Sequence, residues 1–167
     1  MICFTERGAW VCRRLFHKLK ETGEECEAII PKRFLREEWK KEGLKEREEE
    51  FLSQWTGKMF AEKRAMIFVS ATGIAVRAIA PWIRDKMTDP PVVTVDEGAQ
   101  FVIPLLSGHV GGANELARHI ADWLEAVPVI TTATDVNGKF AVDLFASAYH
   151  MTIIDRKEAK NISAAVL

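Results

Sequence analysis

The sequence carries little net charge and no long apolar run. Its 167 residues have a formal net charge of -1, and 48% are hydrophobic, enough for the core of one domain, or of one domain and a fragment. Near-neutral charge gives no electrostatic footprint for nucleic acid or an anionic membrane, and no window reaches the roughly 18 consecutive apolar residues of a membrane span. The start, MICFTERGAW, lacks the basic segment of a secretory signal. We therefore expect a cytoplasmic protein with no nucleic-acid or membrane partner.

Cysteine is scarce, and several familiar motifs are missing. Cys3, Cys12 and Cys26 are odd in number and lack Cys-x-x-Cys spacing, which indicates reduced, partly buried thiols and no metal site built from them. No Gly-x-Gly-x-x-Gly follows a strand, and no glycine loop has the Gly-Lys-Ser/Thr ending of a P-loop. There is no Gly-x-Ser-x-Gly elbow either, so serine hydrolase chemistry receives little weight.

Apolar periodicity predicts strands that alternate with helices. A dense charge run over 36–50 is typical of a solvated helical face, and Phe51, Trp55 and Met59 at four-residue spacing continue it as a helix docked on the core. The tail after residue 140 predicts a helix, a short strand and a closing helix. This alternation predicts a three-layer α/β/α sandwich with a right-handed, mostly parallel sheet of Rossmann-like topology. The predicted strands are 2–5, 26–31, 65–71, 92–98, 101–107 and 127–135, and the other helices are 8–19, 72–81 and 112–125.

Polar residues gather after four of these strands. In an open α/β sheet, ligands bind outside the carboxyl ends of the strands, so the four loops are expected to converge on one edge. The residues are Ser70, Thr72, Gly73 and Arg77 after the third strand; Asp96, Glu97 and Gly98 after the fourth; Ser107, Gly108, His109, Gly111, Gly112 and Asn114 after the fifth; and Thr131, Thr132, Thr134 and Asp135 after the sixth.

Each loop also has a purely structural explanation. The glycines suit turns that need positive φ, Thr72 or Asn114 suits a helix N-cap, and the Asp-Glu-Gly at 96–98 suits a hairpin turn between neighbouring strands. The glycine-rich entry to the 112–125 helix also offers amides to a carboxylate or phosphate.

A direct Ser107–His109 proton transfer is disfavoured, because residues i and i+2 of an extended chain lie roughly 6.5 Å apart. A water-activating base drawn from His109, Asp96, Glu97 or Asp135 suits the same residues better.

The stretch from Gly73 to Asp135 contains DEG, LLSGHVGGAN and TTATD in this order. This combination closely resembles the N-terminal domain of the CbiG family of anaerobic cobalamin biosynthesis. The resemblance implies a CbiG N-terminal-like domain over 1–135, while 136–167 resembles the start of the family's central region. Family members continue well past this length, so the chain is expected to be truncated relative to them.

The resemblance implies a cobalt-precorrin-5A hydrolase that opens a δ-lactone and releases acetaldehyde to give cobalt-precorrin-5B. Cobalt would arrive with the substrate, so no cofactor or protein-held metal is expected. We expect the catalyst among His109, Asp96 and Glu97. The substrate's acid arms would be met by carboxylate-binding and donor groups from the same loops: Gly73, Arg77, Ser107, Gly108, Gly111, Gly112, Asn114, Thr131, Thr132, Thr134 and Asp135.

Two other functions stay open at this point. One is a non-catalytic module that binds a tetrapyrrole or small anion and needs a missing C-terminal domain or another corrin-pathway enzyme for activity. The other is a protein–protein interaction domain that uses the 36–62 helix. A homodimer is also left open.

Overall fold

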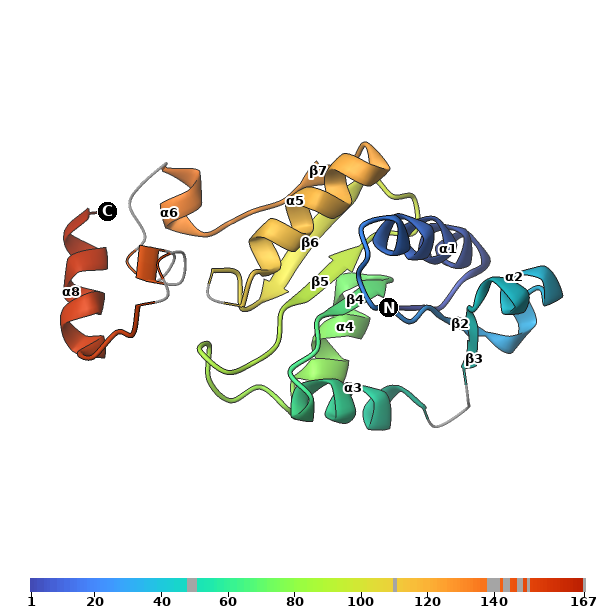
Figure 1. The fold of residues 1–167 in the computed structure, drawn as a ribbon, viewed down its shortest axis with the longest axis horizontal. Helices are drawn as coiled ribbons and strands as arrows, with labels where there is room; N and C mark the ends of the chain where they lie inside the picture. The colour runs from blue at the N-terminus through green and yellow to red at the C-terminus, as the bar shows by residue number, and fades with distance from the viewer. Residues whose placement is uncertain are drawn as a thin grey trace.

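One sheet organises the chain. The computed structural model describes residues 1–47, 51–109, 111–137, 142, 145–146, 149 and 151–166 (Figure 1). In these residues the sheet has seven strands in the order β3-β2-β1-β4-β5-β6-β7. Neighbouring strands are parallel except β5 and β6, which are antiparallel. The strands are β1 (Ile2–Cys3), β2 (Ile29–Pro31), β3 (Lys45–Arg47), β4 (Met66–Val69), β5 (Val92–Val95), β6 (Phe101–Leu106) and β7 (Val127–Pro128).

Helices cover both faces of the sheet, which confirms the predicted three-layer α/β/α architecture. Figure 1 shows α1 and α5 above the sheet and α3 and α4 below it. No helix in the described ranges is long and apolar enough to cross a membrane. The helices are α1 (Glu6–Glu21), α2 (Glu37–Glu42), α3 (Phe51–Ala61), α4 (Thr72–Ile79), α5 (Ala113–Leu124), α6 (Ala133–Val136) and α8 (Arg156–Val166), with a 3-10 turn at Lys32–Phe34.

Two hydrophobic cores lie on the two faces. Because successive side chains of a strand point to opposite faces, Cys3, Val69 and Val95 pack with α1 and α5. Ile2 and Phe68 pack instead with α3 and α4. The strands β1, β4 and β5 are buried throughout, as expected of parallel strands covered on both sides.

The helices dock through the predicted apolar stripes. Trp55 and Met59 of α3 are buried, and so are Ile120 and Leu124 of α5, while Leu116 is half-buried. The side chain of Phe51 lies outside the described part. Cys3 and Cys12 are buried and Cys26 is half-buried, all three unpaired, as predicted.

The continuous helix predicted over the charge run is wrong. The helix α2 ends where Gly43 adopts the left-handed region at φ 104°, a conformation that favours glycine and terminates helices. Leu44 then turns into the core, and the charged strand β3 pairs in parallel with β2 at the edge of the sheet. Charged side chains are tolerated there because an edge strand borders solvent.

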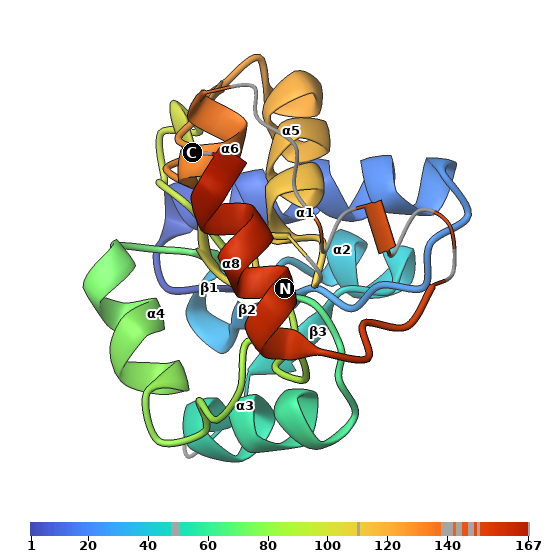
Figure 2. The same ribbon diagram turned by 90° about the vertical axis from the view of Figure 1, so that its left-hand side faces the viewer.

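Two further predictions about the C-terminal part need correction. The strand expected over 127–135 is only two residues long in β7, and Ala133–Val136 forms the short helix α6 instead. Residues 151–155 pair with no described strand, so the short tail strand is wrong, whereas the closing helix is confirmed as α8. Figure 2 views the molecule from the end at which α6 and α8 lie.

The antiparallel pairing of β5 and β6 determines at which ends of the strands the polar loops lie. The carboxyl ends of β1, β4 and β5 lie side by side, because these strands are parallel. We call the row of strand ends on this side of the sheet one edge, and the row at the other ends of the strands the opposite edge. The strand β6 runs the other way, and β7 runs with it. The carboxyl ends of β6 and β7 therefore lie at the opposite edge.

We expect Thr94→Val to stabilise the protein. The Thr94 side chain on β5 is 1% exposed, and its hydroxyl has no hydrogen-bond partner among the described residues. Removing an unsatisfied buried hydroxyl while keeping the β-branched shape should raise the free energy of unfolding by about 1 kcal/mol in urea titration. The matched control is Thr56→Val, since the buried Thr56 hydroxyl donates to the Leu52 carbonyl at 2.7 Å. If both substitutions destabilise equally, the Thr94 hydroxyl has a partner in solution.

Candidate functional site

The residues predicted to form one site fall into two groups at opposite edges of the sheet. The expected convergence of all four loops is wrong, because β6 is antiparallel to β5. Ser70, Thr72, Gly73, Arg77, Asp96 and Glu97 follow β4 and β5 at one edge. The other edge, at the carboxyl ends of β6 and β7, holds Ser107, Gly108, His109, Gly111, Gly112, Asn114, Thr131, Thr132, Thr134 and Asp135.

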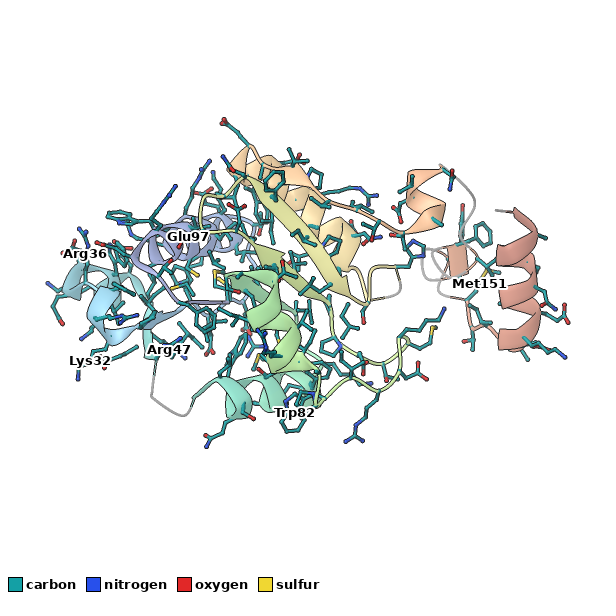
Figure 3. The ribbon with its side chains drawn as sticks, turned by 180° about the vertical axis from the view of Figure 1, so that it is seen from behind. Lys32, Arg36, Arg47, Trp82, Glu97 and Met151 are labelled. Atoms are coloured by element: carbon teal, nitrogen blue, oxygen red, sulfur yellow. The ribbon has the colours of Figure 1, made fainter. Side chains whose placement is uncertain are left out.

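Asp96 closes the hairpin turn between β5 and β6. Its carboxylate accepts hydrogen bonds from the backbone amides of Gly98 at 2.9 Å, Gln100 at 2.8 Å and Phe101 at 2.6 Å. Glu97 projects from the same turn into solvent (Figure 3). The hairpin-turn interpretation of Asp-Glu-Gly therefore accounts for the Asp96 carboxylate, because both of its oxygens accept hydrogen bonds from amides of the turn.

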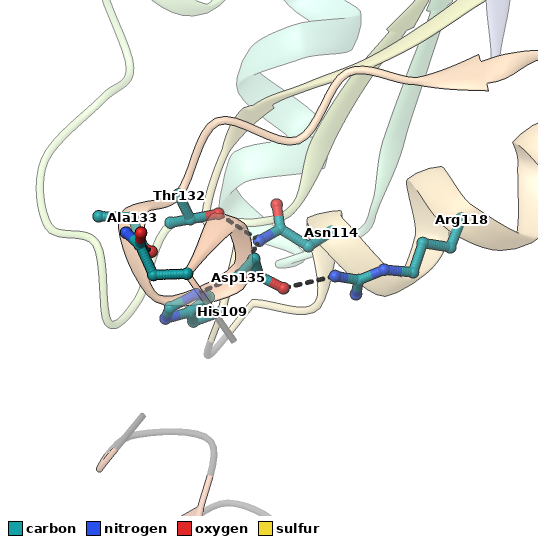
Figure 4. Close-up of polar contacts among 7 residues, drawn as sticks. His109, Asn114, Arg118, Thr132, Ala133 and Asp135 are labelled. Carbon is teal, nitrogen blue, oxygen red and sulfur yellow. Dashed lines mark hydrogen bonds and ion pairs between the residues drawn. The ribbon is translucent and has the colours of Figure 1, made fainter. Parts of the chain in front are cut away.

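A polar cluster at the other edge joins three segments of the chain (Figure 4). The Nε2 atom of His109 lies 2.7 Å from Oδ2 of Asp135. The amide nitrogen of Asn114 donates to Oγ1 of Thr132 at 2.7 Å and to Oδ2 of Asp135 at 3.0 Å. Arg118 binds the second carboxylate oxygen, Oδ1. Asp135 is thus the hub, and its side chain and that of His109 are each 12% exposed.

Arg118 was missed by the sequence analysis. A usable signal was present, because Arg118 follows Asn114 by four residues and side chains at that spacing share one face of a helix.

Ser107 and Thr131 lie near this cluster without joining it. The Ser107 hydroxyl donates to the Asp89 carbonyl at 2.7 Å rather than to His109, so the structure agrees that these two do not pair directly. Thr131 is exposed. Thr134 lies in α6, and its side chain is outside the described part.

The glycines of the 107–112 loop are needed for close packing. A Cβ at Gly111 would lie 2.3 Å from Cβ of Ser107, and a Cβ at Gly108 would lie 2.8 Å from Oδ1 of Asn114. Gly112 faces open space but adopts φ 82°, in the left-handed region that favours glycine. The loop can therefore fold against the start of α5 only with glycine at positions 108 and 111.

The amides at the start of α5 are used by the loop itself. Gly112 donates to the His109 carbonyl at 2.9 Å, Ala113 to Ser107 at 3.1 Å and Asn114 to Gly108 at 3.0 Å. The loop carbonyls thus accept the hydrogen bonds of amides that have no partner within the helix itself. The Gly112 amide is thus directed at the protein rather than at a ligand, and a binding role for Gly111 stays a prediction.

Asp135 is a carboxylate at neutral pH. Burial raises its pKa, but hydrogen bonds from Arg118, His109 and Thr132 outweigh burial and lower the pKa from 3.8 to about 2. An ionised carboxylate only accepts hydrogen bonds, so Nε2 of His109 is the donor in this pair. Proton exchange by His109 would therefore use Nδ1.

A groove adjoins the glycine-rich loop. It encloses about 710 Å³, and its wall includes Gly111 and Gly112 together with Trp55, Leu116 and Trp123. Its size lies within the range of small-molecule sites, roughly 300–1,000 Å³. No group of three or more His, Cys, Asp or Glu side chains in the described ranges could hold a metal ion.

The fold and the site define an α/β protein with a His–Asp cluster at the carboxyl ends of the parallel pair β6 and β7. Residues 54–135 match the family described as cobalamin synthesis G N-terminal. This region contains the whole cluster, and the match confirms the resemblance to the family.

Curated relatives share this region. A cobalt-precorrin-5A hydrolase of Salmonella typhimurium is 53% identical over 100 residues, covering 60% of this chain and 28% of the relative. A cobalt-precorrin-5A hydrolase of Priestia megaterium is 43% identical over 109 residues, covering 65% of this chain and 29% of the relative. The chain spans less than a third of the length of these relatives.

A solved structure is similar over nearly the whole chain. It is a cobalamin biosynthesis protein G homologue from Sulfolobus solfataricus, with a TM-score of 0.54 and 25% identity, and the match covers 99% of this chain and 44% of that one.

Asp135→Asn should destabilise the protein in a pH-dependent way. The lowered pKa of Asp135 means that its ionic contacts contribute stability above pH 4, and that this contribution is lost as pH falls toward 2. Urea titration at pH 7 should give a loss of about 2 kcal/mol, which shrinks between pH 4 and pH 2. Asp122→Asn, at an exposed position of α5, is the control and should change little. A loss that is constant with pH would contradict the ionic origin.

Gly111→Ala should cost more stability than Gly112→Ala. The first places a methyl group against Ser107 and should cost about 3 kcal/mol. The second meets no atom and adds only left-handed backbone strain of about 1 kcal/mol. Chemical denaturation of both variants tests the order, and the reverse order would contradict the packing explanation.

Proposed function

We propose that this chain supplies the His109–Asp135 site of a cobalt-precorrin-5A hydrolase. The observation that carries the proposal is the 2.7 Å contact between His109 and Asp135 inside the region that matches the family. The activity for which the relatives are named supports the substrate class. The unpaired cysteines are consistent with a reducing compartment, and we propose the cytoplasm.

His109 is the proposed general base. Its Nδ1 would take a proton from water as the water attacks the acyl carbon of the δ-lactone, and ionised Asp135 would stabilise the imidazolium that forms. Opening the lactone yields a carboxylate and a hydroxyl group. Removing the hydroxyl proton then forms the carbonyl of acetaldehyde, while the electron pair of the breaking carbon–carbon bond passes to the macrocycle.

Arg118 and the groove beside the loop would bind the substrate. The Arg118 side chain is 47% exposed, so its guanidinium can meet a carboxylate arm while it holds Asp135. The walls formed by Trp55, Leu116 and Trp123 offer apolar surface to a tetrapyrrole. Cobalt is part of the substrate, and the proposal includes no protein cofactor or metal.

A second candidate is a binding module that is inactive alone. It is favoured by one observation, namely that the chain spans under a third of its curated relatives. A C-terminal domain or another enzyme of the pathway would then complete the site. Binding of cobalt-precorrin-5A without turnover, followed by turnover when the C-terminal part of the Salmonella relative is added, would identify this case.

His109→Ala should lower acetaldehyde release about 100-fold or more, because a general base is removed. The measurement uses cobalt-precorrin-5A with this chain, alone and with the C-terminal part of the Salmonella relative. His17→Ala is the matched control, since His17 lies on α1, pairs with Glu42 and lines neither the groove nor the polar cluster. If Glu97→Gln causes the larger loss, the base lies at the opposite edge and the proposal is wrong.

A further inference from the structure

We propose a second ligand site at the crevice where β1 and β4 end, for an anion with at least two carboxylate or phosphate groups. The crevice lies at the edge of the sheet opposite His109, so it goes beyond the proposed function. It is surrounded by three arginines, Arg7, Arg47 and Arg77, that belong to three different elements.

The connections that leave β1 and β4 lead to opposite sides of this crevice. From β1 the chain passes through α1 to β2 on one side, and from β4 it passes through α4 to β5 on the other. The helices α1 and α4, which follow the adjacent strands β1 and β4, lie on opposite faces of the sheet (Figure 1). Open α/β sheets bind ligands at such a switch point.

The three guanidinium groups are attached to neighbouring strand ends. Arg47 donates from Nη1 to the Cys3 carbonyl at 3.4 Å and lies over the Phe4 ring. Arg77 donates from Nη1 to the Gly73 carbonyl at 3.2 Å, so its side chain folds back toward the start of α4. Nη2 of Arg7 lies 3.9 Å from the position that a Cβ would take at Gly98.

These positions are close in space. Cys3 pairs with Val69, and Val69 pairs with Val95, so the three strand ends are next to one another. Adjacent strands are about 4.8 Å apart. The arginines therefore surround an area that one ligand with two or three anionic groups can span.

Within the described ranges, the three arginines have no acidic partner. No acidic side chain in the described part of the chain forms an ion pair with any of the three. The nearest turn carboxylate, Asp96, accepts three amides, and Glu6 and Glu97 are exposed at the rim. Figure 3 labels Arg47 and Glu97, both at this end of the molecule.

The backbone adds donors to the same crevice. Ala71, the residue before α4, provides no side-chain cap, and the Thr72 and Gly73 amides have no hydrogen-bond partner among the described residues, whereas the Ile74 amide donates to the Ala71 carbonyl. Guanidinium groups bind carboxylate and phosphate oxygens in a bidentate manner, and several of them select a ligand with several anionic groups.

Pyrophosphate and citrate serve as probes in an NMR titration of the 167-residue chain. Saturable shifts of the Thr72 and Gly73 amides are expected with at least one probe. Arg47→Gln and Arg77→Gln should each weaken binding roughly tenfold, as the loss of one charged hydrogen bond predicts. Both side chains lie at the surface, so the variants should stay folded, which their spectra report directly.

Two controls separate this site from general charge and from the proposed active site. Arg64→Gln removes an arginine at the opposite edge, where Arg64 precedes β4, and His109→Ala removes the proposed base; both should bind the probes like the wild type. Binding of either probe with this pattern supports the site, and the tighter probe identifies the preferred group. Non-saturable shifts, or equal weakening by Arg64→Gln, would overturn the proposal without affecting the test of acetaldehyde release.

Discussion

Asp96 closes the hairpin turn that sends β6 back across the sheet, and the position of the His109–Asp135 cluster depends on the direction of β6. Asp96 accepts the amides of Gly98, Gln100 and Phe101, which closes the turn within five residues of the chain. A parallel neighbour would have needed a crossover of a dozen or more residues to return to the starting edge. The hairpin instead sends β6 back across the sheet, and α5 returns the chain so that β7 can run beside β6 in parallel.

The sheet therefore has carboxyl ends at both edges. His109 and Asp135 are 26 positions apart in sequence and meet because they follow two adjacent strands of the same direction. The loop before α5 is held against the helix by three backbone bonds, which leaves the imidazole directed at the carboxylate. Packing thus accounts for the glycines of this loop, and the polar cluster accounts for its histidine and for Asn114.

Periodicity in the sequence predicted much of the fold and less of the site. Continuous apolar runs identified β4 and β5, and apolar stripes identified the buried sides of α3 and α5, because burial imposes those patterns directly. Strand direction leaves no such pattern, since β6 reads the same whichever way it runs. The charged edge strand β3 was also missed, because its pairing partner, not its composition, stabilises it. Arg118 was missed because its role comes from the fold of α6.

The distance between the two edges also reduces the number of residues that could act as the base beside the His109–Asp135 cluster. The strands β4 and β5 are four residues long, so the edges are separated by at least about 13 Å of buried sheet. Asp96 and Glu97 cannot then act on the same bond as a group at the other edge. Of the two candidates that remain, Asp135 has its pKa lowered to about 2 and is too weak a base at neutral pH. The imidazole of His109, a side-chain type suited to proton transfer near neutral pH, is therefore the base that we propose, with Asp135 fixing its orientation.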